Sequence, residues 1–116
     1  MKRDIDVIRT ILLEAERRDA MWSINELVTA DRPLDLVGYN GKLLVDAAYL
    51  DGASLLSSLD VAVMGLAWKG HDLLDAVRDA TVFDKIKTML RTKGLSLTLE
   101  AVKAAAPVAL KALIGS

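Results

Sequence analysis

The sequence predicts a mainly helical fold that contains one small β-hairpin, and three observations support this. Residues 4–18 repeat apolar side chains at helical spacing. The helical period then disappears between residues 53 and 68, where Val61, Val63 and Leu66 recur. It returns in residues 72–114.

Composition limits the classes of protein to consider. The chain has 116 residues, of which 53% are hydrophobic, enough for a single domain with its own core. It has no cysteine, so disulfides and thiolate metal sites are excluded, and its one histidine, His71, excludes a multi-histidine site. The start turns acidic at Asp4, and no apolar run approaches the roughly 20 residues that span a bilayer. We therefore expect a cytoplasmic protein without a cofactor and without membrane contact.

The first helix is predicted over residues 4–18. Asp4 and Asp6 lie in its first turn and Arg17 and Arg18 in its last, as the helix dipole favours. Its apolar stripe consists of Ile5, Ile8, Leu12 and Ala15, with Val7 and Ile11 beside it.

Residues 22–28 fit two interpretations. Ser23 and Glu26 have the spacing of a helical capping box, whereas Trp22, Ile24 and Val28 suit a short strand. Irregular structure or a strand leading into the next helix is the preferred interpretation.

A second helix is predicted from Pro33, which suits a first helical turn, to about Tyr49. Asp51-Gly52 then forms a turn. The apolar face of this helix consists of Leu36, Leu43, Leu44, Ala47 and Leu50.

The hairpin is predicted over residues 53–68, with its turn near residues 57–60. Its second strand ends at Trp68, Gly70 breaks it, and a short helix follows over residues 72–79. Both Trp22 and Trp68 are interpreted as core or hairpin anchors.

Two further helices complete the chain. Thr81 and Asp84 mark the start of one, which ends in a left-handed cap at Lys93-Gly94. The last runs from Ser96 to Ile114, with a kink or an interruption at Pro107.

This order of helix, helix, hairpin and helices is that of a winged helix-turn-helix with two C-terminal helices. We therefore expect a winged-helix domain over residues 1–80 and a helical extension over residues 81–116, packed as one compact unit.

Four blocks of sequence resemble one known family. They are MKRDIDVIRTILLEAE at 1–16, GYNGKLLVDAAYLDG at 38–52, LAWKGHDLLDAVRDATVFDKIK at 66–87 and KGLSLTLEAVK at 93–103. In this order and spacing they resemble DUF2513, a family of small bacterial and phage proteins of unknown function. The resemblance implies a winged helix with a regulatory or accessory role in phage or prophage, and it supplies no catalytic residues.

The chain departs from the winged-helix pattern in its second predicted helix. Asn40 and Gly41 stand where histidine and leucine are usual, so Gly41 removes a core side chain inside a helix, at a cost of about 1 kcal/mol relative to alanine. Ala48 stands at the helix end, where glycine is usual.

The resemblance and the element order together predict a DNA-binding transcriptional regulator. The helix at 34–49 would enter the major groove of double-stranded DNA, where Tyr39, Asn40 and Lys42 would read bases. The candidate phosphate contacts are Arg3, Lys85, Lys87 and Arg91.

Charge favours a second hypothesis, a protein-interaction module that does not bind DNA. Residues 19–84 carry a net charge of −7, whereas residues 85–116 carry +5. The acidic central segment would suit a basic protein partner. An enzyme is not expected, because His71 fits a helix start and Asp72, Asp75 and Asp79 fit a solvated helical face.

The last helix is apolar on nearly all sides, so it must be buried, and a monomer of this size covers one side easily. We therefore predict a homodimer formed through this helix. The predicted interface residues are Leu99, Val102, Ala106, Leu110 and Leu113.

Overall fold

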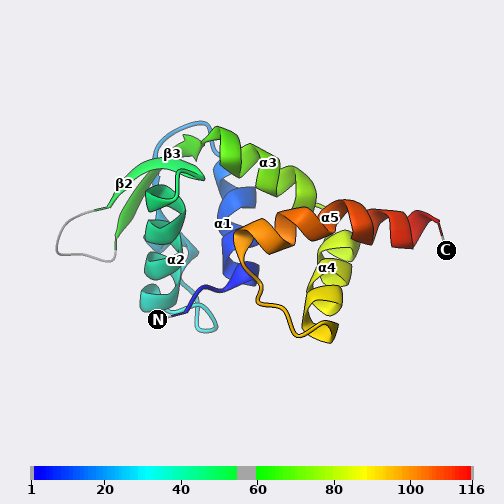
Figure 1. The fold of residues 1–116 in the computed structure, drawn as a ribbon. Helices are drawn as coiled ribbons and strands as arrows, with labels where there is room; N and C mark the ends of the chain where they lie inside the picture. The colour runs from blue at the N-terminus through cyan, green and yellow to red at the C-terminus, as the bar shows by residue number, and fades with distance from the viewer. Residues whose placement is uncertain (1, 55–59, 116) are drawn as a thin grey trace. The chain divides into compact units, whose positions relative to one another are not determined.

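The structure, a computed structural model, describes residues 2–54 and 60–115 (Figure 1). It is mainly helical with a small antiparallel sheet, which confirms the predicted class and adds a third strand to the predicted hairpin. The elements in order are α1 (Ile5–Arg17), β1 (Trp22–Ser23), the 3-10 helix η1 (Ile24–Leu27), α2 (Leu34–Asp46), β2 (Leu50–Ser54), β3 (Val61–Leu66), α3 (Trp68–Val77), α4 (Ala80–Thr92) and α5 (Leu99–Ile114).

Helix α1 begins where the sequence predicted. The carboxylate of Asp4 caps it by accepting hydrogen bonds from the backbone N–H groups of Asp6 and Val7, at 3.0 and 3.1 Å. The predicted apolar stripe is the buried face of the helix, because Ile8, Ile11 and Leu12 have no exposed surface.

Both interpretations of residues 22–28 are correct over part of the segment. Trp22 and Ser23 form the short strand β1, and a complete capping box between Ser23 and Glu26 then begins η1. Strand β1 pairs with β3, so the sheet order is β1-β3-β2. A two-residue strand leaves too short an apolar alternation to be predicted without its partner.

Helix α2 tolerates Gly41 because another element lies against it. A Cβ atom at this position would lie 3.0 Å from Cγ1 of Ile24, a side chain of η1 that is fully buried. The missing side chain noted in the sequence therefore lets η1 approach the helix.

Ala48 ends α2 in the left-handed conformation that glycine usually adopts, as the sequence predicted, with φ 65°. The backbone N–H of Tyr49 donates to the Leu44 carbonyl at 2.8 Å, and that of Leu95 donates to Leu90 at the same distance. Both helices thus end in a Schellman motif, and Ala48 occupies in α2 the place that Gly94, with φ 70°, occupies in α4.

The hairpin begins earlier than predicted. Asp51 and Gly52 lie inside β2 rather than in a turn, and the β2–β3 register shifts between them, which leaves Met64 as the extra residue of a β-bulge. The predicted turn at residues 57–60 lies largely outside the described residues.

Helix α3 corrects three predictions. It begins at Trp68, so Trp68 does not end a strand and Gly70 does not break one. A Cβ atom at Gly70 would lie 2.0 Å from the Tyr49 carbonyl oxygen, so this glycine allows a close approach inside a helix. Trp22 is buried as expected, but Trp68 is 86% exposed and anchors no core.

The last two helices start with side-chain caps that were not predicted. Asp79 caps α4 by accepting from the Val82 N–H, and Thr98 caps α5 by accepting from the Ala101 N–H. Helix α5 continues through Pro107 without interruption. Proline removes one hydrogen bond to the preceding turn, which the packing of α5 against α4 can outweigh.

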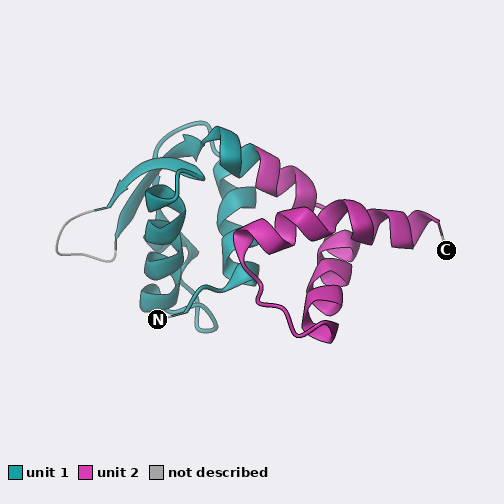
Figure 2. Ribbon diagram, in the orientation of Figure 1, with its two compact units in different colours: residues 1–71 teal, residues 72–116 magenta. Residues whose placement is uncertain are grey.

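The chain divides into two compact units, residues 1–71 and 72–116 (Figure 2). The boundary between these units falls inside α3, and the expected winged-helix domain over residues 1–80 with an extension over residues 81–116 stays a prediction. In the first unit the buried side chains of α1, η1, α2 and the sheet include Ile11, Ile24, Leu44 and Val63. In the second, α4 packs against α5, and the buried side chains include Phe83, Ile86 and Val102.

Candidate nucleic-acid interface

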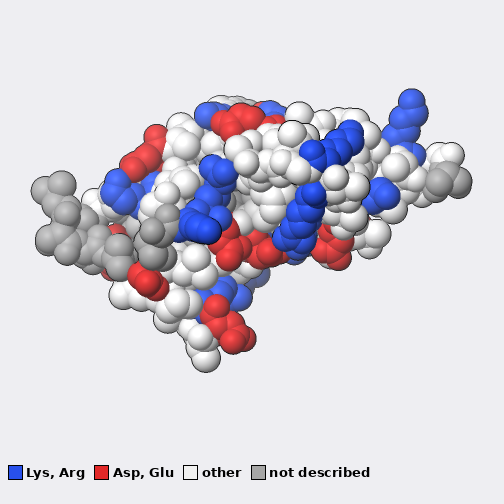
Figure 3. Space-filling model, turned by 60° about the horizontal axis from the view of Figure 1, so that its bottom comes forward, with Lys and Arg blue, Asp and Glu red and all other residues white. Residues whose placement is uncertain are grey.

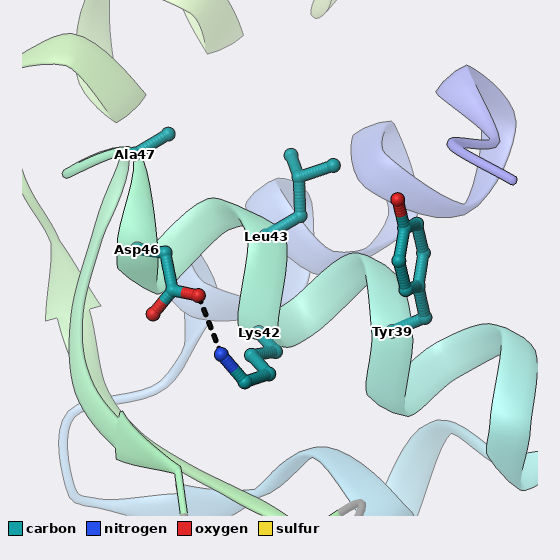
Figure 4. A pocket seen from close by; sticks show the side chains of 5 residues that line it. All are labelled: Tyr39, Lys42, Leu43, Asp46 and Ala47. Carbon is teal, nitrogen blue, oxygen red and sulfur yellow. Dashed lines mark hydrogen bonds and ion pairs between the residues drawn. The ribbon is translucent and has the colours of Figure 1, made fainter. Parts of the chain in front are cut away.

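The exposed side of α2 is the surface that the sequence assigned to DNA. Side chains at helical spacing line a shallow hollow of about 510 Å³ on it (Figure 4). Tyr39, Leu43 and Ala47 form its apolar part, and Lys42 and Asp46 its charged part. The Lys42 Nζ atom lies 2.6 Å from an Asp46 carboxylate oxygen, so the one lysine of this helix already has an anionic partner.

Asn40 is not part of that surface. It is fully buried, and its side-chain amide donates hydrogen bonds to the carbonyls of Leu36 and Lys2, at 2.9 and 3.4 Å. Its Oδ1 accepts from the backbone N–H of Asp4 at 2.9 Å. The prediction that Asn40 reads bases is therefore wrong. Polarity suggested exposure, but a buried amide is favourable where every donor and acceptor has a partner.

The same hydrogen bonds fix the N-terminal segment beside α2. Two of them join the amide of Asn40 to backbone atoms of Lys2 and Asp4, on either side of Arg3. The chain start therefore lies next to the first half of α2 (Figure 1). Lys2 and Arg3 are both exposed, so they add cations beside a helix that is itself acidic.

A third cation lies at the other end of α2. Lys69, in the first turn of α3, donates from Nζ to the Ala47 carbonyl at 3.1 Å, and its Nζ lies 4.7 Å from the centre of the Tyr49 ring. A lysine there satisfies a terminal carbonyl and complements the negative end of the helix dipole. Sequence reasoning missed Lys69 because the two residues are 22 positions apart.

Arg18, the C-cap residue of α1, joins α1 to η1. It lies 2.6 Å from the Glu14 carboxylate and 2.9 Å from that of Glu26, and its guanidinium stacks 5.1 Å from the Trp22 ring centre. Hydrogen bonds from Arg17 and then Arg18 lower the pKa of Glu14 below its ordinary value. Arg18 and the Ser23 N–H lower the pKa of Glu26.

The predicted phosphate contacts of α4 lie in residues 72–116. Arg91 is exposed and Lys85 is half-buried. Only 15% of the Lys87 side chain is exposed, because its Nζ lies 4.5 Å from the centre of the Phe83 ring and 3.6 Å from an Asp84 oxygen. Lys87 is thus a weaker candidate than its charge suggested.

Charge on the first unit is mixed. Residues 1–71 hold eight basic and eleven acidic side chains, a net charge of −3, whereas residues 72–116 carry +2. On the face that Figure 3 draws, groups of basic side chains have acidic side chains beside them. Any contact of this unit with phosphate must therefore be made by individual basic side chains and not by a broad basic surface.

The predicted dimer residues do not share one surface. Leu99, Val102 and Ala106 are buried within the chain, whereas Leu110 and Leu113 are 47% and 40% exposed. The buried three cover the core beneath α5, which the sequence could not distinguish from an outer face because nearly every position of this helix is apolar.

Sites for other chemistry are few among residues 2–54 and 60–115. No three His, Asp or Glu side chains there could together hold a metal ion, and this includes Asp72, Asp75 and Asp79. His71 is exposed, and its ring lies 6.3 Å from that of Trp68. Within the same described ranges, no helix has the length and apolar character needed to cross a membrane.

Comparison with known proteins now assigns the family. Residues 2–96 match the family described as "Hypothetical protein (DUF2513)". The chain belongs to the DUF2513 family. It is also similar to an uncharacterized protein of Haemophilus influenzae (strain ATCC 51907 / DSM 11121 / KW20 / Rd), with 36% identity over 106 residues, which cover 89% of this chain and 90% of that protein. No solved structure matches the chain.

Proposed function

We propose that residues 1–71 form a winged-helix domain that binds double-stranded DNA as a non-enzymatic regulator of the phage or prophage type. One observation carries the proposal: α1, β1, a helical turn, α2 and a β2–β3 hairpin follow in that order, and β1 pairs with β3. This is the arrangement in which a winged helix presents its second helix to the major groove.

Local chemistry supports two kinds of contact. Tyr39 and Lys42 lie on the exposed face of α2 and would meet bases or phosphate in the groove. Lys2 and Arg3, held beside α2 through Asn40, would meet the flanking phosphates. Asp46 opposes this role, because its carboxylate holds Lys42 and would face the DNA.

The test is fluorescence anisotropy on random and genomic-neighbourhood duplexes across a salt series. Lys42→Ala and Arg3→Ala are each expected to weaken binding several-fold at every sequence and to reduce the salt slope by about 1. Asp46→Asn should tighten DNA binding, because this substitution removes the carboxylate that pairs with Lys42. Arg17→Ala is the matched control: this exposed arginine ends α1, about 20 Å along the helix from Asp4, and should have little effect.

A second candidate function is a protein-interaction module. The net charge of −3 and the Lys42–Asp46 ion pair favour it, because phosphate binding needs unneutralised cations. If folded wild-type protein binds no duplex at low salt, the DNA proposal fails and this candidate replaces it. Unchanged affinity in both Lys42→Ala and Arg3→Ala would instead show that DNA binds elsewhere on the chain.

A further inference from the structure

The second unit carries a groove that the proposed function does not use. It has a volume of about 500 Å³ and lies between α3, the start of α4 and α5, all within residues 72–116. Its apolar lining comes from Ala76, Val82, Ala106, Pro107 and Leu110. Its charged lining comes from Asp72, Asp75, Asp79 and Lys103, which are three carboxylates and one ammonium group.

Two of these carboxylates, those of Asp72 and Asp75, are exposed and held only in surface ion pairs, whereas the carboxylate of Asp79 caps α4. Asp72 lies 3.7 Å from Lys103, and its side chain is 58% exposed. Asp75 accepts from Arg78 at 2.9 Å, and its side chain is 71% exposed. Exposed ion pairs contribute little and exchange readily with water or other cations. The groove therefore fits an apolar ridge that also carries positive charge.

The end of α5 is such a ridge. Every described residue after Ala109 is exposed, and Leu110, Leu113 and Ile114 share one stripe at helical spacing. Ile114 is 75% exposed, and Leu110 and Leu113 are 47% and 40% exposed, so the three side chains form one contiguous apolar patch of the kind that marks interaction surfaces. Lys111 lies within this stretch, and residues 101–116 contain no acidic side chain.

We propose that a second copy of this chain occupies the groove, with Leu113 and Ile114 of each copy inserted into the groove of the other. Leu110 belongs both to the groove and to the ridge, so one surface presents both halves of the contact. A two-fold interface requires that kind of self-complementarity. Lys111 of each copy then brings its charge to the aspartates of its partner.

The first test measures the mass of the free full-length protein by light scattering and sedimentation over a concentration series. The wild type should be dimeric. Leu113→Glu and Ile114→Glu should each raise the dissociation constant at least about tenfold, because a carboxylate would be buried beside aspartates. Val108→Glu is the matched control. Val108 is 55% exposed on the same helix but lies two residues from Leu110, on the opposite side of α5, so its variant should remain dimeric.

The second test locates the contact by disulfide cross-linking, which is simple because the chain has no cysteine. Ala76→Cys in the groove, mixed with Leu113→Cys, should give a cross-linked dimer under mild oxidation. Neither variant can form a bond within one chain, and Ala76→Cys mixed with Val108→Cys should give little product. All three sites lie outside the fully buried core, and circular dichroism checks folding.

A monomer at all concentrations would overturn the proposal and leave the groove to another molecule. A dimer that survives both glutamate variants, or that cross-links equally through Val108→Cys, would overturn it too. Neither measurement contains DNA, so the result is independent of the DNA-binding proposal.

Discussion

The backbone N–H of Asp4 donates a hydrogen bond to Oδ1 of Asn40, 2.9 Å away and 36 residues later in the sequence. Asp4 is also the N-cap of α1. One buried amide thus fixes the start of the chain, the first turn of α1 and the middle of α2 together. The residue expected to read bases instead holds the cations Lys2 and Arg3 beside the helix.

Asn40→Ala should lower the free energy of unfolding by about 1–3 kcal/mol, because the backbone groups that now hydrogen-bond to the amide would lose their partner. Asn40→Asp should lower the free energy of unfolding further at pH 7, since a buried carboxylate would face the carbonyls of Leu36 and Lys2. Burial would raise the pKa of that new carboxyl, so the extra loss should diminish as the pH falls and the group becomes neutral. Urea denaturation at pH 5 and pH 8 measures both effects. Equal stability of Asn40→Ala and wild type would contradict the buried network.

Gly41→Ala should destabilise the protein although alanine is the better helix former. The added Cβ would lie 3.0 Å from Ile24 Cγ1, so this fully buried side chain must give by a few tenths of an ångström. In an Ile24→Ala background, which removes that atom, the same change should instead stabilise by up to about 1 kcal/mol. Denaturation of the four members of this double-mutant cycle gives the coupling. Additive effects would show that there is no steric clash between a side chain at position 41 and Ile24.

Ala48→Gly should raise stability by up to about 1 kcal/mol. A Cβ atom is unfavourable at φ 65°, by roughly 1–2 kcal/mol, and the greater freedom of glycine in the unfolded chain offsets part of the gain. The neighbouring control is Ala47→Gly, where φ is −89° and glycine should destabilise by about 0.5–1 kcal/mol. Thermal melts that rank these variants in the opposite order would show that α2 does not end in this conformation.

The ion pairs of Glu14 with Arg17 and Arg18, and of Glu26 with Arg18, should make the stability of the first unit fall at acid pH. In the folded protein the pKa values of Glu14 and Glu26 lie below the ordinary value of 4.5. Their contribution is therefore complete well above pH 4.5 and is lost as the pH falls through the lowered values. A Glu14→Gln, Glu26→Gln variant should be less stable than wild type at pH 7, and this difference should shrink towards pH 3. Denaturation curves across this range measure it. A constant difference would exclude the linkage.

The sequence determined much of this fold without any tertiary information. Three features could be predicted because they depend on side chains within a turn or two of each other. They are the apolar period of α1, the left-handed cap at Gly94 and the left-handed conformation required of Ala48. The four blocks of family resemblance likewise identified DUF2513, which the match over residues 2–96 confirms.

Which polar and apolar residues face solvent depends on contacts between elements that are distant in the sequence. Asn40 is buried because the chain start lies against it, whereas Trp68, which begins a helix instead of ending a strand, is 86% exposed. On α5, Val102 is covered while Leu113 is not, although both are apolar residues of one helix. Burial depends on which other element lies opposite a side chain, and that contact joins residues too far apart in sequence for local periodicity to predict.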